Sequence, residues 1–172
     1  VFLLKQKGIP FHTLHMYHDF EFGGGMPDPK PRFLKDLSTT IKNTPNSIGL
    51  ANDGDADRFG VVNEKGEYVS PNDIISILLK YLVQKGLKGS VVKTVGSSIL
   101  IDLVGEKLGI NAIETPVGFK YLASDILKAR QEGRDIIIAG EESGGMTAYG
   151  HIPEKDGILA DFIILDLVAK EN

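Results

Sequence analysis

The pattern of hydrophobic and polar residues changes near residue 70. From Pro71 onward, segments with apolar residues at helical spacing alternate with short, nearly continuous apolar runs. Helical spacing predicts helices, and short apolar runs between turn-forming residues predict buried strands. Alternating helices and strands are typical of a mostly parallel sheet covered by helices. The predicted fold class is therefore α/β, with mostly parallel sheets flanked by helices.

Capping residues and apolar spacing set the boundaries of the elements after residue 70. Helices are expected over residues 71–85, 97–108, 118–130 and 157–171, and strands over residues 90–95, 111–115 and 135–139. Open α/β sheets bind ligands in the loops that leave the carboxyl ends of such strands. We therefore look for binding residues in these loops.

Residues 1–70 show a weaker pattern, with fewer elements and a loop rich in glycine and proline. We expect the end of a helix over residues 1–8, a strand over 10–16, a loop over 17–32, a helix over 32–42, a strand over 47–51 and a hairpin formed by 59–63 and 67–69. The hairpin is predicted by its β-branched residues on either side of a Lys-Gly turn.

Three aspartates, Asp53, Asp55 and Asp57, alternate with small residues directly after the apolar segment 47–51. In an extended turn, residues two apart point to the same side, so the carboxylates would converge. Like charges about 4 Å apart repel by about 4 kcal/mol at an effective dielectric near 20, so the cluster needs a cation or protonation. Mg²⁺ prefers such oxygen ligands. Arg58 adds a fixed positive charge suited to a phosphate, which indicates a metal-dependent phosphate site.

An EF-hand calcium loop is one alternative for this run. Asp53, Asp55, Asp57 and Glu64 match the ligands at positions 1, 3, 5 and 12 of such a loop. Position 6 should be glycine, but it is Arg58 here, and the flanking residues predict strands rather than helices. The EF-hand is therefore the weaker interpretation.

Two further alternatives remain. In haloacid-dehalogenase phosphatases, an Asp-x-Asp after a buried strand supplies an aspartyl nucleophile, but further acidic and lysine motifs must follow in later loops. A non-catalytic module that binds a divalent metal is the alternative outside the enzymes.

Composition excludes several classes of protein. The 172 residues carry a net charge of −4, and the basic residues are scattered, which argues against a nucleic-acid partner. The sequence contains no cysteine, which rules out disulfides and thiolate metal sites and fits a cytoplasmic location. The longest apolar runs, 74–83 and 158–168, are too short to span a bilayer, so no membrane segment is expected.

The acidic run and three later segments together resemble the alpha-D-phosphohexomutases, the superfamily of phosphoglucomutases and phosphomannomutases. Residues 53–58 are similar to the family's Asp-Gly-Asp-x-Asp-Arg metal loop, 114–121 to its sugar-specificity loop, 140–145 to its Gly-Glu-x-Ser-Gly sugar-binding loop and 151–157 to its Lys-Asp-Gly segment. The segments occur in the family's order, and the resemblance spans nearly the whole chain.

The resemblance implies a role for each site residue. Asp53, Asp55 and Asp57 would bind Mg²⁺, Arg58 and Lys155 would be catalytic, and Thr115, Val117, Gly118, Glu141, Ser143 and Lys155 would bind substrate. A carboxylate and a hydroxyl, as in Glu141 and Ser143, can together bind a sugar diol. The Thr115 hydroxyl is expected near the sugar. Near a metal and Arg58, the pKa of Lys155 is expected to fall, which would suit proton transfer.

A member of this family would interconvert hexose 1-phosphate and hexose 6-phosphate through an enzyme phosphoserine. The residues of segments 140–145 and 151–157 resemble those of phosphoglucomutases more, which favours glucose over mannose or glucosamine. The resemblance assigns residues 1–70 to the later part of the second domain and residues 71–172 to the third. The phosphoserine loop of domain 1 and the phosphate loop of domain 4 have no counterpart in this sequence.

We therefore expect the chain to be a fragment that is inactive alone and whose natural partners are domains 1 and 4. The opening strand of domain 2 would lie before Val1, which would leave a sheet edge exposed. Residues 1–70 are accordingly expected to be less stable than residues 71–172, or to be protected by self-association.

Overall fold

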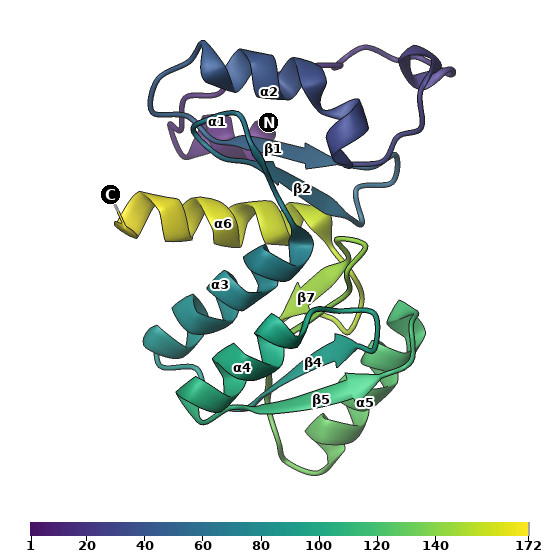
Figure 1. The fold of residues 1–172 in the computed structure, drawn as a ribbon, viewed down its shortest axis with the longest axis vertical. Helices are drawn as coiled ribbons and strands as arrows, with labels where there is room; N and C mark the ends of the chain where they lie inside the picture. The colour runs from purple at the N-terminus through teal and green to yellow at the C-terminus, as the bar shows by residue number, and fades with distance from the viewer. Residues whose placement is uncertain (172) are drawn as a thin grey trace.

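The computed structural model describes residues 1–171, with side chains through Lys170, and its described strands form two sheets (Figure 1). The first sheet is antiparallel, with strand order β1 (Gly49–Asn52), β2 (Phe59–Val62) and β3 (Tyr68–Val69). The second has the order β5 (Asn111–Thr115), β4 (Ser90–Thr94), β6 (Ile136–Gly140) and β7 (Met146–Ala148).

Six α-helices are present among the described residues. They are α1 (Phe2–Gln6), α2 (Lys35–Lys42), α3 (Pro71–Gln84), α4 (Ile99–Leu108), α5 (Phe119–Gln131) and α6 (Gly157–Glu171), with short 3₁₀ turns at Phe22–Gly24 and Pro31–Phe33. None of the described helices is both long and apolar enough to cross a membrane.

The predicted α/β alternation after residue 70 is confirmed. Strand β4 lies between β5 and β6 and pairs in parallel with both. Strand β7, which pairs antiparallel with β6, was not predicted, because its short apolar run follows two glycines and resembles a loop. The parallel order holds only for this second sheet, since all pairing in the first sheet is antiparallel.

The strand expected over residues 10–16 is wrong, because this segment contains neither helix nor strand. Pro10 has no backbone N–H to donate, and none of the described strands pairs with the segment. Met16 is 66% exposed, so the apolar side chains of this segment do not form a buried face.

Local capping explains why the later helices begin where they do. The side chains of Ser70, Ser98 and Asp156 accept hydrogen bonds from first-turn N–H groups at 3.2, 3.1 and 2.9 Å, and Pro71 occupies the first turn of α3. Side-chain oxygens at this position satisfy N–H groups that have no partner within the helix. These starts were readable from the sequence because the signal is local.

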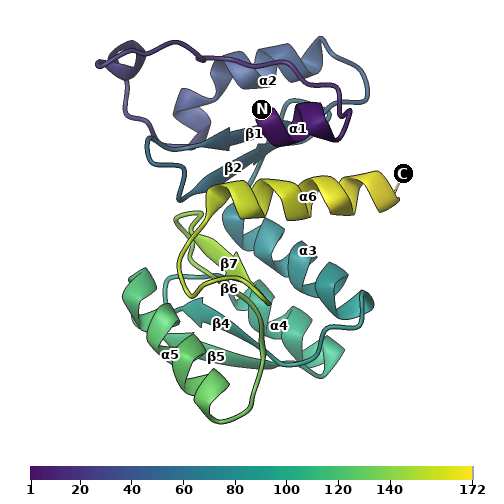
Figure 2. The same cartoon turned by 180° about the vertical axis from the view of Figure 1, so that it is seen from behind.

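The two sheets share one hydrophobic core. Helices α3 and α4 cover one face of the second sheet and α5 the other, while α6 lies between the sheets (Figures 1 and 2). Phe59 and Val61 of β2 belong to the same buried cluster as Leu78 of α3 and Ile164 of α6. The next residue, Val62, faces the other way and packs under α2. Helix α6 therefore joins the two parts of the chain through packing.

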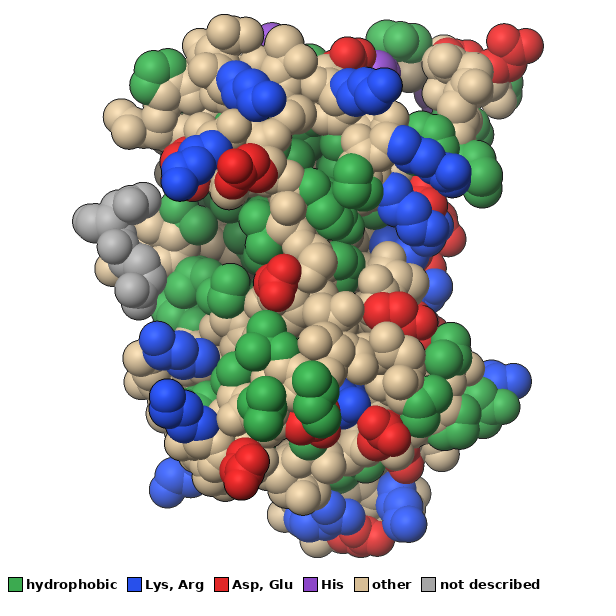
Figure 3. Space-filling view, in the orientation of Figure 1, with side chains coloured by type: hydrophobic (Ala, Val, Ile, Leu, Met, Phe, Trp, Pro, Cys, Tyr) green, Lys and Arg blue, Asp and Glu red, His purple; other side chains and the backbone are tan. Residues whose placement is uncertain are grey.

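The N-terminal segment is loosely attached by comparison. Its apolar side chains face solvent, with Phe2 70%, Phe20 92% and Met26 63% exposed. Figure 3 shows hydrophobic side chains at the surface of this upper part of the molecule. Helix α1 contributes no buried residue. Segments with few buried contacts open locally at low free energy.

We predict that amide hydrogens of residues 1–26 exchange fastest and those of β4 and β6 slowest, because every residue of these two strands is buried. Hydrogen–deuterium exchange followed by mass spectrometry measures this. Equal protection of residues 1–26 and β6 would contradict the prediction and would indicate that self-association covers the N-terminal segment.

Helix α6 carries two aspartates with opposite electrostatic environments. Burial raises the pKa of Asp161 to about 7, and its Oδ1 has no hydrogen-bond partner. Hydrogen bonds from Lys170, Lys85 and Tyr81 lower the pKa of Asp166. The charged carboxylate is thus disfavoured at Asp161 and favoured at Asp166.

These opposite shifts predict opposite mutational effects. As the pH rises from about 4 to about 7, the folded chain keeps the Asp161 proton that the unfolded chain releases, so Asp161 costs stability. At pH 8, Asp161→Asn should raise the free energy of unfolding by about 1–3 kcal/mol, with little effect near pH 4. The matched Asp166→Asn should instead lower it at pH 8. Denaturant titrations at both pH values test this, and a pH-independent effect of Asp161→Asn would contradict it.

Candidate functional site

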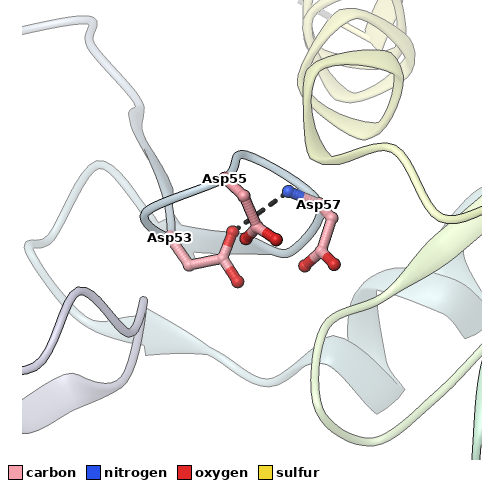
Figure 4. Close-up of side chains that lie close together, drawn as sticks. All are labelled: Asp53, Asp55 and Asp57. Carbon is pink, nitrogen blue, oxygen red and sulfur yellow. Dashed lines mark hydrogen bonds between the residues drawn. The ribbon is translucent and has the colours of Figure 1, made fainter.

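The three aspartates lie in the loop that joins β1 to β2. Asn52 pairs with Phe59 across the hairpin, so residues 53–58 form the connection, and the three carboxylates point to the same side of it (Figure 4). One oxygen from each carboxylate lies within 4.8 Å of the others. Ala56 adopts a left-handed conformation with φ of 58°, which is uncommon for a residue other than glycine. The convergence expected from the alternation is therefore present.

Asp53 organises this loop. Its Oδ1 accepts hydrogen bonds from the backbone N–H groups of Asp57 and Arg58 at 3.0 and 3.1 Å, and its Oδ2 accepts from Arg58 Nε at 2.5 Å. Burial by itself would raise the pKa of Asp53, but hydrogen bonds from Arg58 lower it. The same side-chain hydrogen bond with Asp53 raises the pKa of Arg58. Asp53 is therefore held as a carboxylate.

This arrangement fits a hard divalent cation. The carboxylate oxygens are close enough to share one ion, and Oδ2 of Asp53, which accepts only the Arg58 Nε bond, keeps a second lone pair. The EF-hand interpretation is wrong, because strands β1 and β2 flank the loop and Glu64 lies beyond the far end of β2.

A second loop, residues 141–145, packs directly on the loop 53–58 that carries the three aspartates. The N–H of Phe59 donates to the carbonyl oxygen of Gly144 at 3.0 Å, and Arg58 forms a bridge with Gly145. A Cβ atom on Gly144 would lie 2.6 Å from the Phe59 carbonyl oxygen, so only glycine allows this approach. The two backbones are thus in contact although they are far apart in the sequence.

Glu141, Ser143 and Lys155 therefore gather beside the aspartates. Glu141 is buried, and Ser143 Oγ lies 3.1 Å from Glu141 Oε2. Lys155 Nζ lies 2.7 Å from Asp57 Oδ2. This contact raises the pKa of Lys155, because a neighbouring carboxylate favours the charged ammonium more than Arg58 disfavours it. The lowering expected beside a bound metal stays a prediction.

The loop after β5 lies farther away. Thr115 and Gly140 are the last residues of β5 and β6, at the carboxyl end of the second sheet. Strand β4 lies between these two strands, so they are about 10 Å apart. Thr115 is only 4% exposed, and the expected contact of its hydroxyl with a sugar stays a prediction. Val117 is 56% exposed, and Gly118, with φ of 124°, precedes the first turn of α5. The backbone of this loop remains the candidate contact.

Two anchoring residues were missed from the sequence. Asp28, with a side chain only 6% exposed, binds Arg58 Nη1 at 3.3 Å and Lys30 Nζ at 2.8 Å. Glu142 accepts a hydrogen bond from Thr94 Oγ1 at 2.6 Å and so ties the second loop to β4. A lone aspartate between prolines gives no sequence signal for a partner 30 residues away.

Comparison with known proteins agrees with this geometry. Residues 70–172 match the family model of the phosphoglucomutase/phosphomannomutase alpha/beta/alpha domain III, and residues 2–66 match that of domain II. The chain belongs to the phosphoglucomutase/phosphomannomutase family. The resemblance to this family that the sequence indicated is therefore confirmed.

Individual relatives support the same assignment. Phosphoglucomutase 1 of Drosophila melanogaster is 37% identical over 165 residues, which cover 93% of this chain and 28% of that protein. A Methanopyrus kandleri protein named "Probable phosphoglucosamine mutase" is 32% identical over 142 residues, covering 83% and 30%. A Thermus thermophilus structure described as a "putative phosphomannomutase" has a TM-score of 0.81 and 40% identity, covering 87% and 33%. The chain thus spans less than a third of the length of these curated relatives.

We predict that the ion pair between Asp28 and the guanidinium of Arg58 stabilises the folded chain. Asp28→Asn removes one of the three carboxylates that form ion pairs with the partly buried Arg58 guanidinium and should lower the free energy of unfolding by about 1–3 kcal/mol. The matched Lys30→Met removes the other, half-exposed partner of Asp28 and should change it by less than about 0.5 kcal/mol. Denaturant titration measures both variants, and equal effects would contradict a special role for the Asp28–Arg58 pair.

Proposed function

We propose that the chain is the metal- and sugar-binding part of a Mg²⁺-dependent phosphohexomutase that acts on glucose phosphates in the cytoplasm. Residues 1–70 would be the later part of its second domain and residues 71–172 its third. The phosphoserine and the main phosphate-binding loop would belong to domains 1 and 4 as partners. Membership of the phosphoglucomutase/phosphomannomutase family supports the reaction class.

One observation carries the proposal: the sugar loop and the metal loop are in contact. Lys155 Nζ lies 2.7 Å from Asp57, and the Gly144 carbonyl accepts from the Phe59 N–H at 3.0 Å. A hexose hydroxyl bound at Glu141 and Ser143 would therefore lie close to the oxygens that bind the metal. This proximity is what phosphoryl transfer to a sugar hydroxyl requires.

The chain's charged residues would act on the transferring phosphoryl group. Asp53, Asp55 and Asp57 would hold Mg²⁺, which when bound offsets the charge of that group. Arg58, fixed by Asp53, would present its remaining N–H groups to phosphate oxygens. Lys155, as an ammonium, would bind a phosphate or hydroxyl oxygen.

Neutral and acidic groups would orient the sugar. The Glu141 carboxylate would accept hydrogen bonds from hydroxyls, and Ser143 Oγ would donate or accept one. The backbone of Thr115, Val117 and Gly118 would border the other side of the sugar. Recognition through hydroxyls allows the sugar to bind in either orientation, which suits a reaction at both of its ends.

The implied reaction consists of two phosphoryl transfers. A sugar hydroxyl attacks the phosphoserine phosphorus, the P–O bond to serine breaks, and the hydroxyl proton passes to the serine oxygen. The resulting bisphosphate returns its other phosphoryl group to serine, whose proton passes to the vacated sugar oxygen. Both steps need the serine supplied by another domain, so the chain alone should not turn over.

Binding of glucose 1-phosphate tests the proposal. We expect weak binding, about millimolar, that strengthens with Mg²⁺, because the site lacks its other phosphate contacts. Glu141→Gln should weaken binding by about tenfold, since one carboxylate hydrogen bond is worth about 1.5 kcal/mol. The matched Glu106→Gln, exposed on α4, should have no effect. Isothermal calorimetry measures these affinities, with mannose 1-phosphate as the comparison for glucose preference.

Other outcomes would reject parts of this proposal. Mutase turnover by the pure chain, prepared from a host without its own enzyme, would show that no other domain is needed. Tight calcium binding without any binding of hexose phosphate would favour the non-catalytic metal-binding module.

A further inference from the structure

The metal-binding loop is held from outside by the first turn of α6. The N–H of Gly157, the first residue of α6, donates to the carbonyl oxygen of Ala56 at 3.0 Å. Ala56 is the loop residue with the left-handed backbone, one position before the ligand Asp57. The hydrogen bond thus stabilises the strained peptide that orients Asp57.

The contact at Gly157 leaves no room for a side chain. A Cβ atom there would lie 2.5 Å from the carbonyl oxygen of Arg58, 2.8 Å from Asn52 Nδ2 and 2.9 Å from the carbonyl oxygen of Ala56. Two of these atoms are backbone, which cannot move without moving the loop itself. The start of α6 is therefore fitted closely to the metal loop.

Asn52 completes the contact from the other side. Its Nδ2 donates to the carbonyl oxygen of Arg58 at 3.2 Å, which closes the base of the loop. Its Nδ2 also lies against the start of α6, since a Cβ atom on Gly157 would come within 2.8 Å of it. Asn52 therefore connects both ends of the metal loop to the helix, although it is not itself a candidate ligand.

The same turn positions Lys155 and the second sheet. Lys155 precedes Gly157 by two residues and contacts Asp57, while the N–H of Asp156 donates to Met146 of β7 at 2.9 Å. Residues 155–157 thus bind the metal loop and the sheet that carries the sugar loop. Any shift of α6 would move Lys155 and Ala56 together.

We propose that Gly157 and Asn52 are positioning residues that brace the metal-binding loop against α6, so that metal binding and the seating of α6 are thermodynamically coupled. This inference rests on the proposed function, since it takes Asp53, Asp55 and Asp57 as the ligands. Outer residues that orient metal ligands commonly change metal affinity by 10- to 100-fold when substituted. Coupling of this kind is reciprocal, so the metal should also stabilise the seated helix.

The experiment measures Mn²⁺ binding to the 172-residue chain by electron paramagnetic resonance of the free ion. Gly157→Ala should weaken Mn²⁺ binding by about tenfold or more, and Asn52→Ala by about three- to tenfold. Mn²⁺ should also raise the melting temperature of the unsubstituted chain more than that of either variant, because weaker binding gives less stabilisation.

Matched variants separate positioning from a general loss of stability. Gly89→Ala places a Cβ atom against the Asp135 carbonyl oxygen, at the amino ends of the central strands β4 and β6. Asn63→Ala removes side-chain hydrogen bonds within the hairpin turn beyond β2. Both should lower the melting temperature but leave the Mn²⁺ affinity of the folded chain unchanged.

The outcomes distinguish this inference from the proposed function. Asp55→Asn should greatly weaken Mn²⁺ binding, and if it does not, the proposed metal site itself is wrong. Suppose that Asp55→Asn weakens Mn²⁺ binding, while Asn52→Ala and folded Gly157→Ala bind Mn²⁺ as the unsubstituted chain does. The positioning role of Asn52 and Gly157 is then overturned, and the proposed function stands. If Gly157→Ala does not fold, Asn52→Ala alone decides, because losing its amide creates no clash.

Discussion

The close approach of two backbones, at Phe59 and Gly144, is the constraint on which the site depends. Their hydrogen bond is 3.0 Å long, and the absence of a side chain at Gly144 permits it. The aspartate loop, residues 53–58, belongs to an antiparallel sheet and the loop 141–145 to a mostly parallel one, so neither sheet could place the other loop by itself. This contact joins a cluster of carboxylates to a buried glutamate and a lysine.

Electrostatics explains why these groups tolerate one another. Three aspartates and Glu141 bring negative charge into a small volume, and Arg58 and Lys155 each bind one of the aspartates. The pairing holds Asp53 ionised and Lys155 protonated. A divalent cation would share the same oxygens, so cation binding and the Lys155–Asp57 contact are connected through one carboxylate.

Helix α6 has two roles that follow from its position between the sheets. Its buried side chains, such as Ile164, belong to the shared core, while its first turn contacts the metal loop. Asp161 lies between these regions with one unpartnered buried oxygen. Placing a carboxylate there costs stability when it is charged, and its burial raises the pKa of Asp161.

The sequence by itself determined the local features of this protein: the helices capped by Ser70, Ser98 and Asp156, and the strand-to-loop transition before Asp53. Capping, periodicity and charge alternation act between residues close in the chain, so they are readable there. The three aspartates and the family motifs were recognisable for the same reason. Features that depend on long-range contacts could not be predicted from the sequence. They are strand β7, the burial of Thr115, the raised pKa of Lys155 and the partners of Asp28. Only tertiary structure decided these, because each depends on a group brought close by the packing of distant segments.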